Sequence, residues 1–253
     1  MKIITLNLHL WQEKDQLEKL KRVADYINEN DIDICFFQEV AQKFDAPLLF
    51  DNIREDNNAY LVYKDLKGKY NISYEFKKRG WGIFEEGLAI VSKYPIISKE
   101  WFFISKTQKL MDWKTRVILK VTYEVEGKPV HCFAVHMGWS DGNEVYELRA
   151  ANLMKEVNKF GNDLVILAGD YNCPRDVREY NCWDSLYSSV DLAGIDTANV
   201  PTFAFNLDSH MDTKNKHIDY IFFNKKLDIK DYRVHFKETD GLVSDHYLVY
   251  TEI

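Results

Sequence analysis

The segment Leu164-Val165-Ile166-Leu167-Ala168-Gly169-Asp170-Tyr171-Asn172 tells most about the architecture of this chain. Its continuous apolar run is typical of a strand that is buried on both faces. The run stops at Gly169, and Asp170 and Asn172 follow at once. A carboxylate next to an apolar strand is costly to bury unless a cation or hydrogen-bond donors satisfy it. The segment therefore predicts a buried strand that ends at a polar site.

The same pattern recurs along the chain. Polar residues stand at the ends of further apolar runs, namely Asn7, Glu39, His136, Asp245 and His246, whereas Asp219 stands at the start of its run. One such residue usually caps a turn. So many together predict a cluster of acids, amides and imidazoles where strand ends meet. Oxygen ligands of this kind suit Mg²⁺ better than Zn²⁺.

The predicted elements alternate from end to end without a Pro/Gly/Ser-rich linker, which favours a single domain over residues 1–253. Strands are predicted at residues 3–8, 32–38, 87–92, 97–103, 116–124, 130–136, 164–169, 217–223, 231–236 and 247–252. Helices are predicted at residues 15–30 and 144–160, the second with Leu148, Ala151, Leu153, Met154 and Val157 as its apolar side. Residues 42–82 are expected to be largely irregular. These elements predict a mixed α/β sandwich with mainly antiparallel sheets.

Composition narrows the classes of function. The net charge of −7 argues mildly against a protein that coats nucleic acid through a basic face. No apolar run approaches the length of a membrane span, and we expect no membrane partner. Met1-Lys2 leads directly into a predicted strand, and the four cysteines are scattered without CxxC spacing. We therefore expect a cytoplasmic protein with reduced cysteines.

The ordered motifs resemble those of the endonuclease/exonuclease/phosphatase superfamily. The resemblance runs from Asn7 to His246 and rests on Thr5-Leu6-Asn7, Gln38-Glu39-Val40, Gly87-Leu88-Ala89-Ile90-Val91-Ser92, Val135-His136, Gly169-Asp170-Tyr171-Asn172, Ile218-Asp219-Tyr220-Ile221 and Ser244-Asp245-His246. It implies a four-layer α/β/β/α sandwich like that of deoxyribonuclease I. It also implies phosphoester hydrolysis with Mg²⁺, for which Mn²⁺ is a possible substitute.

The resemblance also implies roles for individual residues. The metal would be bound by Glu39 with Asn7 and Asp245, and the catalytic residues would be Asp170, Asn172, His246, His136 and Asp219. In this scheme Asp219 holds the His246 imidazole, and Glu86 could orient His136. Many relatives carry an acidic residue two positions after the first Asn, where this chain has His9. The number of ligands supplied by the first strand is therefore open.

Three classes of substrate compete. A small phosphorylated metabolite is favoured, because parts of the chain are similar to bacterial enzymes that dephosphorylate sugar phosphates such as maltose 6'-phosphate. Tryptophans that could stack on sugar rings stand in predicted loops at Trp11, Trp81, Trp113 and Trp139. Trp139 is the preferred substrate contact, and Arg116 could contact phosphate or be a solvated arginine.

The other two substrates are less favoured. A nuclease or DNA-repair phosphodiesterase would need basic loops, and Lys77-Lys78-Arg79 is short and is expected to be a solvated surface. A sphingomyelinase-like phospholipase would need a membrane-binding element that the sequence does not indicate. An inactive binding module is disfavoured because the motif residues are all present.

Overall fold

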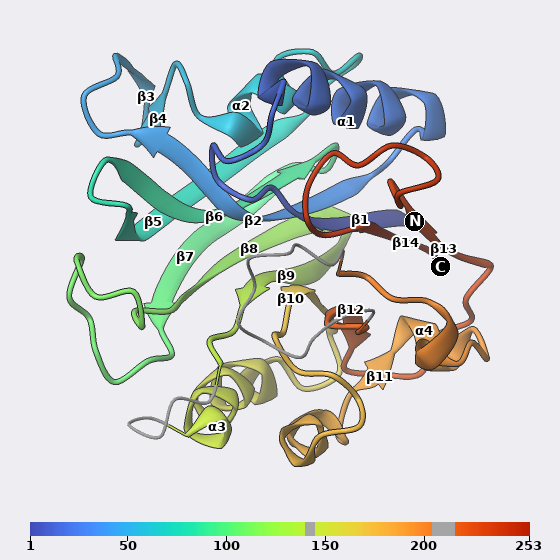
Figure 1. Cartoon of the computed structure of the whole chain (residues 1–253). Coiled ribbons are helices and arrows are strands. Elements are labelled where there is room, and N and C mark those ends of the chain that lie inside the picture. Colours follow the sequence, from blue (N-terminus) through green and yellow to red (C-terminus); the bar gives the residue numbers. More distant parts are fainter. Residues whose placement is uncertain (140–144, 204–215) are drawn as a thin grey trace.

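The computed structural model describes residues 1–139, 145–203 and 216–253, and its centre consists of two six-stranded sheets packed face to face (Figure 1). The first sheet has the order β13 (Asp231–His235), β14 (Leu248–Glu252), β1 (Lys2–Asn7), β2 (Ile34–Lys43), β6 (Phe84–Ser92), β5 (Asn71–Gly80). The second has the order β11 (Tyr187–Ser188), β12 (Asp219–Phe223), β10 (Leu164–Asp170), β9 (Lys128–His136), β8 (Val117–Val125), β7 (Ile96–Phe103). A small hairpin joins β3 (Leu48–Phe50) to β4 (Ile53–Arg54).

Helices cover the outer faces of both sheets (Figure 1). The first sheet carries α1 (Gln16–Asn30) and α2 (Asn58–Tyr63), and the second carries α3 (Tyr146–Val157) and α4 (Ser189–Leu192). Three short 3₁₀ segments complete the described elements: η1 (Asn158–Phe160), η2 (Arg178–Trp183) and η3 (Thr197–Asn199). Within the described strands, only the β1–β2 and β9–β10 pairs are parallel. The predicted four-layer, mainly antiparallel α/β/β/α sandwich is confirmed.

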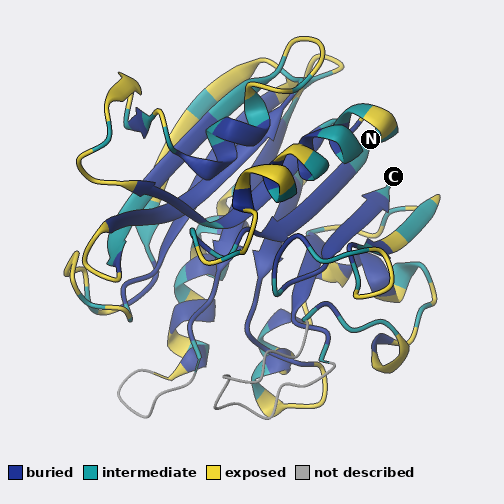
Figure 2. Ribbon diagram, turned by 45° about the horizontal axis from the view of Figure 1, so that its top comes forward, coloured by how far each residue is buried: buried dark blue, intermediate teal, exposed yellow. Residues whose placement is uncertain are grey.

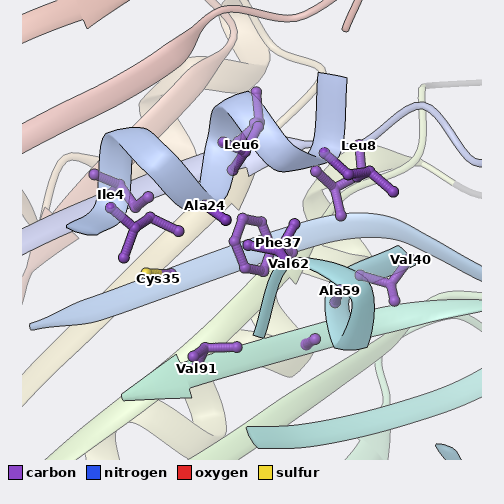
Figure 3. Close-up of a cluster of buried hydrophobic side chains, with 14 of the residues drawn as sticks. Ile4, Leu6, Leu8, Ala24, Cys35, Phe37, Val40, Ala59, Val62 and Val91 are labelled. Atoms are coloured by element: carbon purple, nitrogen blue, oxygen red, sulfur yellow. The ribbon is translucent and has the colours of Figure 1, made fainter. Parts of the chain in front are cut away.

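Three buried clusters hold the layers together. The cluster between the sheets combines Phe36 and Ile90 of the first sheet with Leu119, Ile166 and others of the second. A second cluster packs α1 and α2 onto the first sheet, with Phe37, Ala24 and Val62 in contact (Figure 3). The third packs α3 and the 178–190 region onto the second sheet. Figure 2 shows the resulting pattern of buried strands beneath exposed loops and outer helix faces, as expected when apolar burial drives packing.

The region expected to be irregular was wrongly interpreted. Residues 42–82 contain α2 and the ten-residue strand β5. The sequence of β5, Asn-Ile-Ser-Tyr-Glu-Phe-Lys-Lys-Arg-Gly, conceals its period, because the register to β6 shifts between Phe76 and Lys78. A bulge of this kind inserts one residue and reverses the alternation of side chains beyond it.

The buried face of α3 also differs from the prediction. Leu148 is 45% exposed, whereas Tyr146 and Arg149 are buried with Leu153 and Val157. The Arg149 guanidinium donates to the Trp139 carbonyl (2.9 Å), which offsets part of its desolvation. Because the buried face includes the charged Arg149, the positions of apolar residues alone predict the wrong face. The expected first residue of this helix, Glu144, lies outside the described residues.

None of the helices described, in residues 1–139, 145–203 and 216–253, is long and apolar enough to span a bilayer.

Candidate active site

The register of neighbouring strands places three polar residues side by side at one end of the strands of the second sheet. Asp170 of β10 is paired with His136 of β9 on one side and with Asp219 of β12 on the other. Gly169 precedes Asp170 where β10 approaches β9 closely: a Cβ on Gly169 would lie 1.8 Å from the Val135 carbonyl oxygen. Only glycine fits there, which explains the Gly-Asp pairing in the motif.

The first sheet brings Asn7 and Glu39 to the same edge. Asn7 ends β1, as predicted. Glu39 does not follow the end of its strand, because β2 continues to Lys43. The register of β2 against β6 shifts between Phe37 and Val40, and Glu39 has a φ of 49°. A bulge next to a functional site can change the direction in which a side chain points. Glu39 is one of the residues in this bulge.

The Asn7 side chain links residues from both sheets. Its Nδ2 donates to Glu39 Oε1 (3.0 Å) and Asp170 Oδ2 (3.3 Å), and lies 3.5 Å from His246 Nε2. Its Oδ1 accepts the His9 backbone N–H (2.9 Å), which orients the amide. In this arrangement Asn7 presents donors to the carboxylates. Its oxygen has a second lone pair, which a metal could use.

His246 is held by Asp219. The His246 Nδ1 lies 2.9 Å from Asp219 Oδ2, and the Thr202 hydroxyl accepts the Asp219 backbone N–H (3.0 Å). The Ser244 hydroxyl accepts the His246 backbone N–H (3.1 Å). Burial alone would lower the pKa of His246, but the carboxylates of Asp219 and Asp170 raise it well above its usual value. The imidazolium form is therefore favoured at neutral pH.

Asp170 lies at the centre of the group. Its Oδ1 accepts the Asn172 backbone N–H (2.8 Å), and its Oδ2 lies 3.6 Å from His136 Nε2 and 3.8 Å from His246 Nε2. Burial raises the pKa of Asp170 to about 7, and Asp219 adds to this effect while His246 opposes it. A carboxylate with a pKa near neutrality is suited to proton transfer.

Asn172 stands beside this carboxylate in a left-handed backbone conformation (φ 48°). Its Nδ2 donates to the Met137 carbonyl (2.8 Å), and the same amide nitrogen carries a second N–H that a ligand could use.

A second acidic group adjoins Glu39. Asp245 Oδ1 lies 3.6 Å from His9 Nδ1, which also contacts Glu13 (2.6 Å). Burial and the charges of Glu86 and Asp245 raise the pKa of Glu39. Such unfavourable crowding of carboxylates is what a bound cation relieves. Glu39 and Asp245 therefore fit a hard divalent ion by charge and ligand type, and His9 replaces a potential acidic ligand with an imidazole paired to Glu13.

Sequence reasoning missed Lys78. It was expected at a solvated surface, but its side chain is 15% exposed and lines a small cavity with Arg116 and His136. Its Nζ lies 2.5 Å from Glu86, so Glu86 is paired with Lys78 rather than acting mainly on His136. Burial, together with the charges of Arg116 and Lys78, lowers the pKa of His136 well below its usual value. No sequence signal identified Lys78, because the bulge that turns its side chain toward the cavity cannot be recognised from the alternation of polar and apolar residues.

The four loop tryptophans have different surroundings. Trp11 packs against the core and donates to the Ala41 carbonyl (3.3 Å). Trp81 and Trp113 are 74% and 58% exposed. Trp139 lines a cavity of about 180 Å³ that also includes Asn172, Tyr146 and Pro174. Trp139 thus lines the same cavity as Asn172 of the polar cluster.

A four-layer sandwich with this polar cluster at one edge defines a phosphoester hydrolase. Residues 12–246 match the Endonuclease/Exonuclease/phosphatase family, and the chain belongs to that family.

Solved structures support the fold. The chain is similar to an endonuclease/exonuclease/phosphatase family protein from Leptotrichia buccalis C-1013-b, with 28% identity, a TM-score of 0.88 and coverage of 100% of this chain and 99% of that chain. A mannosyl-6-phosphatase from Bacteroides thetaiotaomicron VPI-5482 has 19% identity and a TM-score of 0.72, with coverage of 100% and 98%. The second likeness is evidence of fold alone.

A curated relative is the protein named Sphingomyelinase C 2 of Leptospira interrogans serogroup Icterohaemorrhagiae serovar Lai (strain 56601), which is 22% identical over 249 residues. The match covers 88% of this chain and 38% of that protein. The chain therefore spans well under half the length of this relative.

Proposed function

We propose that the chain is a phosphatase that hydrolyses the phosphomonoester of a small sugar phosphate, with Mg²⁺ as its cofactor and Mn²⁺ as a possible substitute. The observation that carries the proposal is the network centred on Asn7, whose amide lies between Glu39, Asp170 and His246. This network brings together Glu39 as the proposed metal ligand, Asp170 as the proposed proton acceptor and the His246 imidazolium. Hydrolysis of a phosphoester requires little else of a protein.

In the proposed reaction Asp170 orients a water molecule and accepts a proton from it. The water oxygen forms a bond to phosphorus as the bond from phosphorus to the sugar oxygen breaks. The sugar leaves as an alcohol after it takes up a proton, and inorganic phosphate remains. The ionised form of Asp170 is required, and the Asn7 amide and the Asn172 backbone N–H hold it in place.

Charge on the phosphoryl oxygens would be stabilised by donors from both sheets. His246, held protonated by Asp219, faces Asp170 across the site. The second N–H of Asn172 and the neutral imidazole of His136 are further donors. Arg116 would contribute a fixed positive charge next to His136.

The metal would be held by Glu39 and Asp245 with the Asn7 oxygen, and the Asn7 amide N–H would also position Glu39. When bound, the ion supplies positive charge to the phosphoryl group and lowers the pKa of water.

Two features favour a small sugar phosphate over a nucleic acid or lipid. Trp139 and Asn172 share a cavity of about 180 Å³, so an indole and an amide donor could meet one sugar ring. The basic side chain of Lys77, near the site, is already paired with Glu75 (2.8 Å). Paired cations are poorly suited to following a nucleic-acid backbone.

A substrate panel tests this proposal. Purified protein with Mg²⁺ would be incubated with sugar phosphates, nicked or abasic duplex DNA, and sphingomyelin vesicles. We expect inorganic phosphate from at least one sugar phosphate. Cleavage of DNA or sphingomyelin without phosphate release from any sugar phosphate would overturn the sugar-phosphate assignment.

The metal assignment predicts a specific effect of Glu39→Gln. Loss of the carboxylate charge should raise the Mg²⁺ concentration for half-maximal rate by about 10-fold or more. Glu252→Gln is a matched control, because Glu252 is half-buried in β14 and contacts Tyr250 (3.0 Å) away from the site. Rates would be measured across an Mg²⁺ titration after EDTA treatment. Full activity in excess EDTA, or an unchanged Mg²⁺ requirement in Glu39→Gln, would contradict the assignment.

A further inference from the structure

A cavity lined by cations lies beside the catalytic cluster. The buried Arg116 and His136 and the partly buried Lys78 line it together with Lys77 and Glu86. The cavity adjoins the proposed reaction centre, because His136 Nε2 lies 3.6 Å from Asp170 and 4.0 Å from Glu39. Its free volume of about 20 Å³ is enough for one water-sized oxygen.

The bulge in β5 is what turns Lys78 into this cavity. Tyr74 and Phe76 of β5 pack toward the helices, and regular alternation would send Lys78 the same way. The extra residue at the bulge places Lys78 opposite Glu86 on the face that meets the second sheet. Desolvation of a lysine is costly, and a local irregularity of the backbone leaves the Lys78 side chain only 15% exposed here.

Arg116 supplies the second cation. Its Nη1 donates to the carbonyls of Trp113 (2.6 Å) and Thr115 (3.0 Å), so the guanidinium is anchored by backbone. Its Nε is buried and has no hydrogen-bond partner among the described residues. Burial lowers the pKa of Arg116, and burial with the neighbouring Arg116 charge lowers that of Lys78. Burial is the main cause of both shifts, and the Glu86 charge opposes them.

We propose that Lys78 and Arg116 form a pocket for one non-bridging oxygen of the phosphoryl group, and that Lys78 thereby determines specificity for phosphomonoesters over phosphodiesters. This inference rests on the proposed phosphoesterase function. A monoester has three non-bridging oxygens and carries a charge between about −1.5 and −2 at pH 7. A diester has two such oxygens and a single charge. The positive charge of Lys78 and Arg116 therefore favours the more highly charged monoester.

Inhibition by inorganic phosphate tests the pocket directly. Lys78→Met keeps the aliphatic stem and removes the charge, and Lys78→Met/Glu86→Gln removes both members of the ion pair in case the single variant folds poorly. We expect the inhibition constant for phosphate to rise about 10- to 100-fold in both variants, as expected for loss of a hydrogen bond to a charged group. Lys120→Met is a matched control, because Lys120 is 10% exposed, is paired with Glu100 (2.8 Å) and lies outside the cavity.

Ester selectivity supplies the second measurement. With p-nitrophenyl phosphate and bis(p-nitrophenyl) phosphate as substrates, Lys78→Met should lower kcat/KM for the monoester about 10- to 100-fold and for the diester less than about threefold. Equal losses for both esters, or phosphate inhibition equal to that of the Lys120→Met control, would overturn the pocket. A wild type inactive on sugar phosphates would refute the sugar assignment alone, because the two p-nitrophenyl esters still decide the pocket.

Discussion

Replacement of Asp170 by Asn should lower kcat by about 1,000-fold or more while the protein stays folded. The substitution keeps the shape and an acceptor for the Asn172 N–H, but it removes the group proposed to take a proton from water. Steady-state kinetics with the best sugar phosphate from the panel would measure the loss. Saturating Mg²⁺ ensures that weaker metal binding does not account for it.

Thermal unfolding separates this effect from a loss of structure. Burial raises the pKa of Asp170 to about 7, so above that pH the wild type bears the cost of a buried carboxylate that asparagine avoids. The variant in turn loses an acceptor for the Asn7 amide. These changes oppose each other, and we expect Tm to stay within about 4 °C of the wild type at pH 8. A stable variant with near-normal kcat would show that Asp170 is not the proton acceptor.

Much of this architecture was predictable from sequence because most central strands obey simple rules. The apolar run before Asp170 and the largely apolar segments of β8 and β9 each indicate a strand by themselves, and each forms one close to the predicted bounds. The polar residues at the strand ends could likewise be placed at one edge, since the register of neighbouring strands aligns His136, Asp170 and Asp219.

The features that escaped prediction arise from backbone irregularity. Glu39 lies in a bulge within β2, and Lys78 follows a bulge within β5. Each inserted residue reverses which face the following side chains occupy, and a periodic pattern cannot reveal it. Both irregularities lie beside the site. One positions Glu39, a candidate metal ligand, and the other positions the partly buried Lys78. The period of a strand therefore does not predict the direction of side chains such as Glu39 and Lys78, whose position depends on a bulge.

Asp219 offers the second large effect, and its signature is a shift in pH dependence. Activity should require ionised Asp170 and protonated His246, which gives a bell-shaped profile of kcat/KM. The rising limb follows Asp170, whose pKa burial raises to about 7, before any bound metal lowers it. The falling limb follows His246: burial opposes its protonation, but Asp219 and Asp170 raise its pKa well above the usual value.

Replacement of Asp219 by Asn removes the carboxylate nearest to His246 (2.9 Å). The pKa of His246 must then fall, so the imidazolium is lost at lower pH and the falling limb moves to lower pH. We expect kcat at the optimum to drop about 100-fold as well, because the ring loses the charge that stabilises its protonated form. Asp163→Asn is the matched control: Asp163 lies 3.5 Å from His131, outside the site, and its loss should leave the profile in place. A falling limb that stays put in Asp219→Asn, or that moves equally in Asp163→Asn, would mean that His246 does not act as the imidazolium.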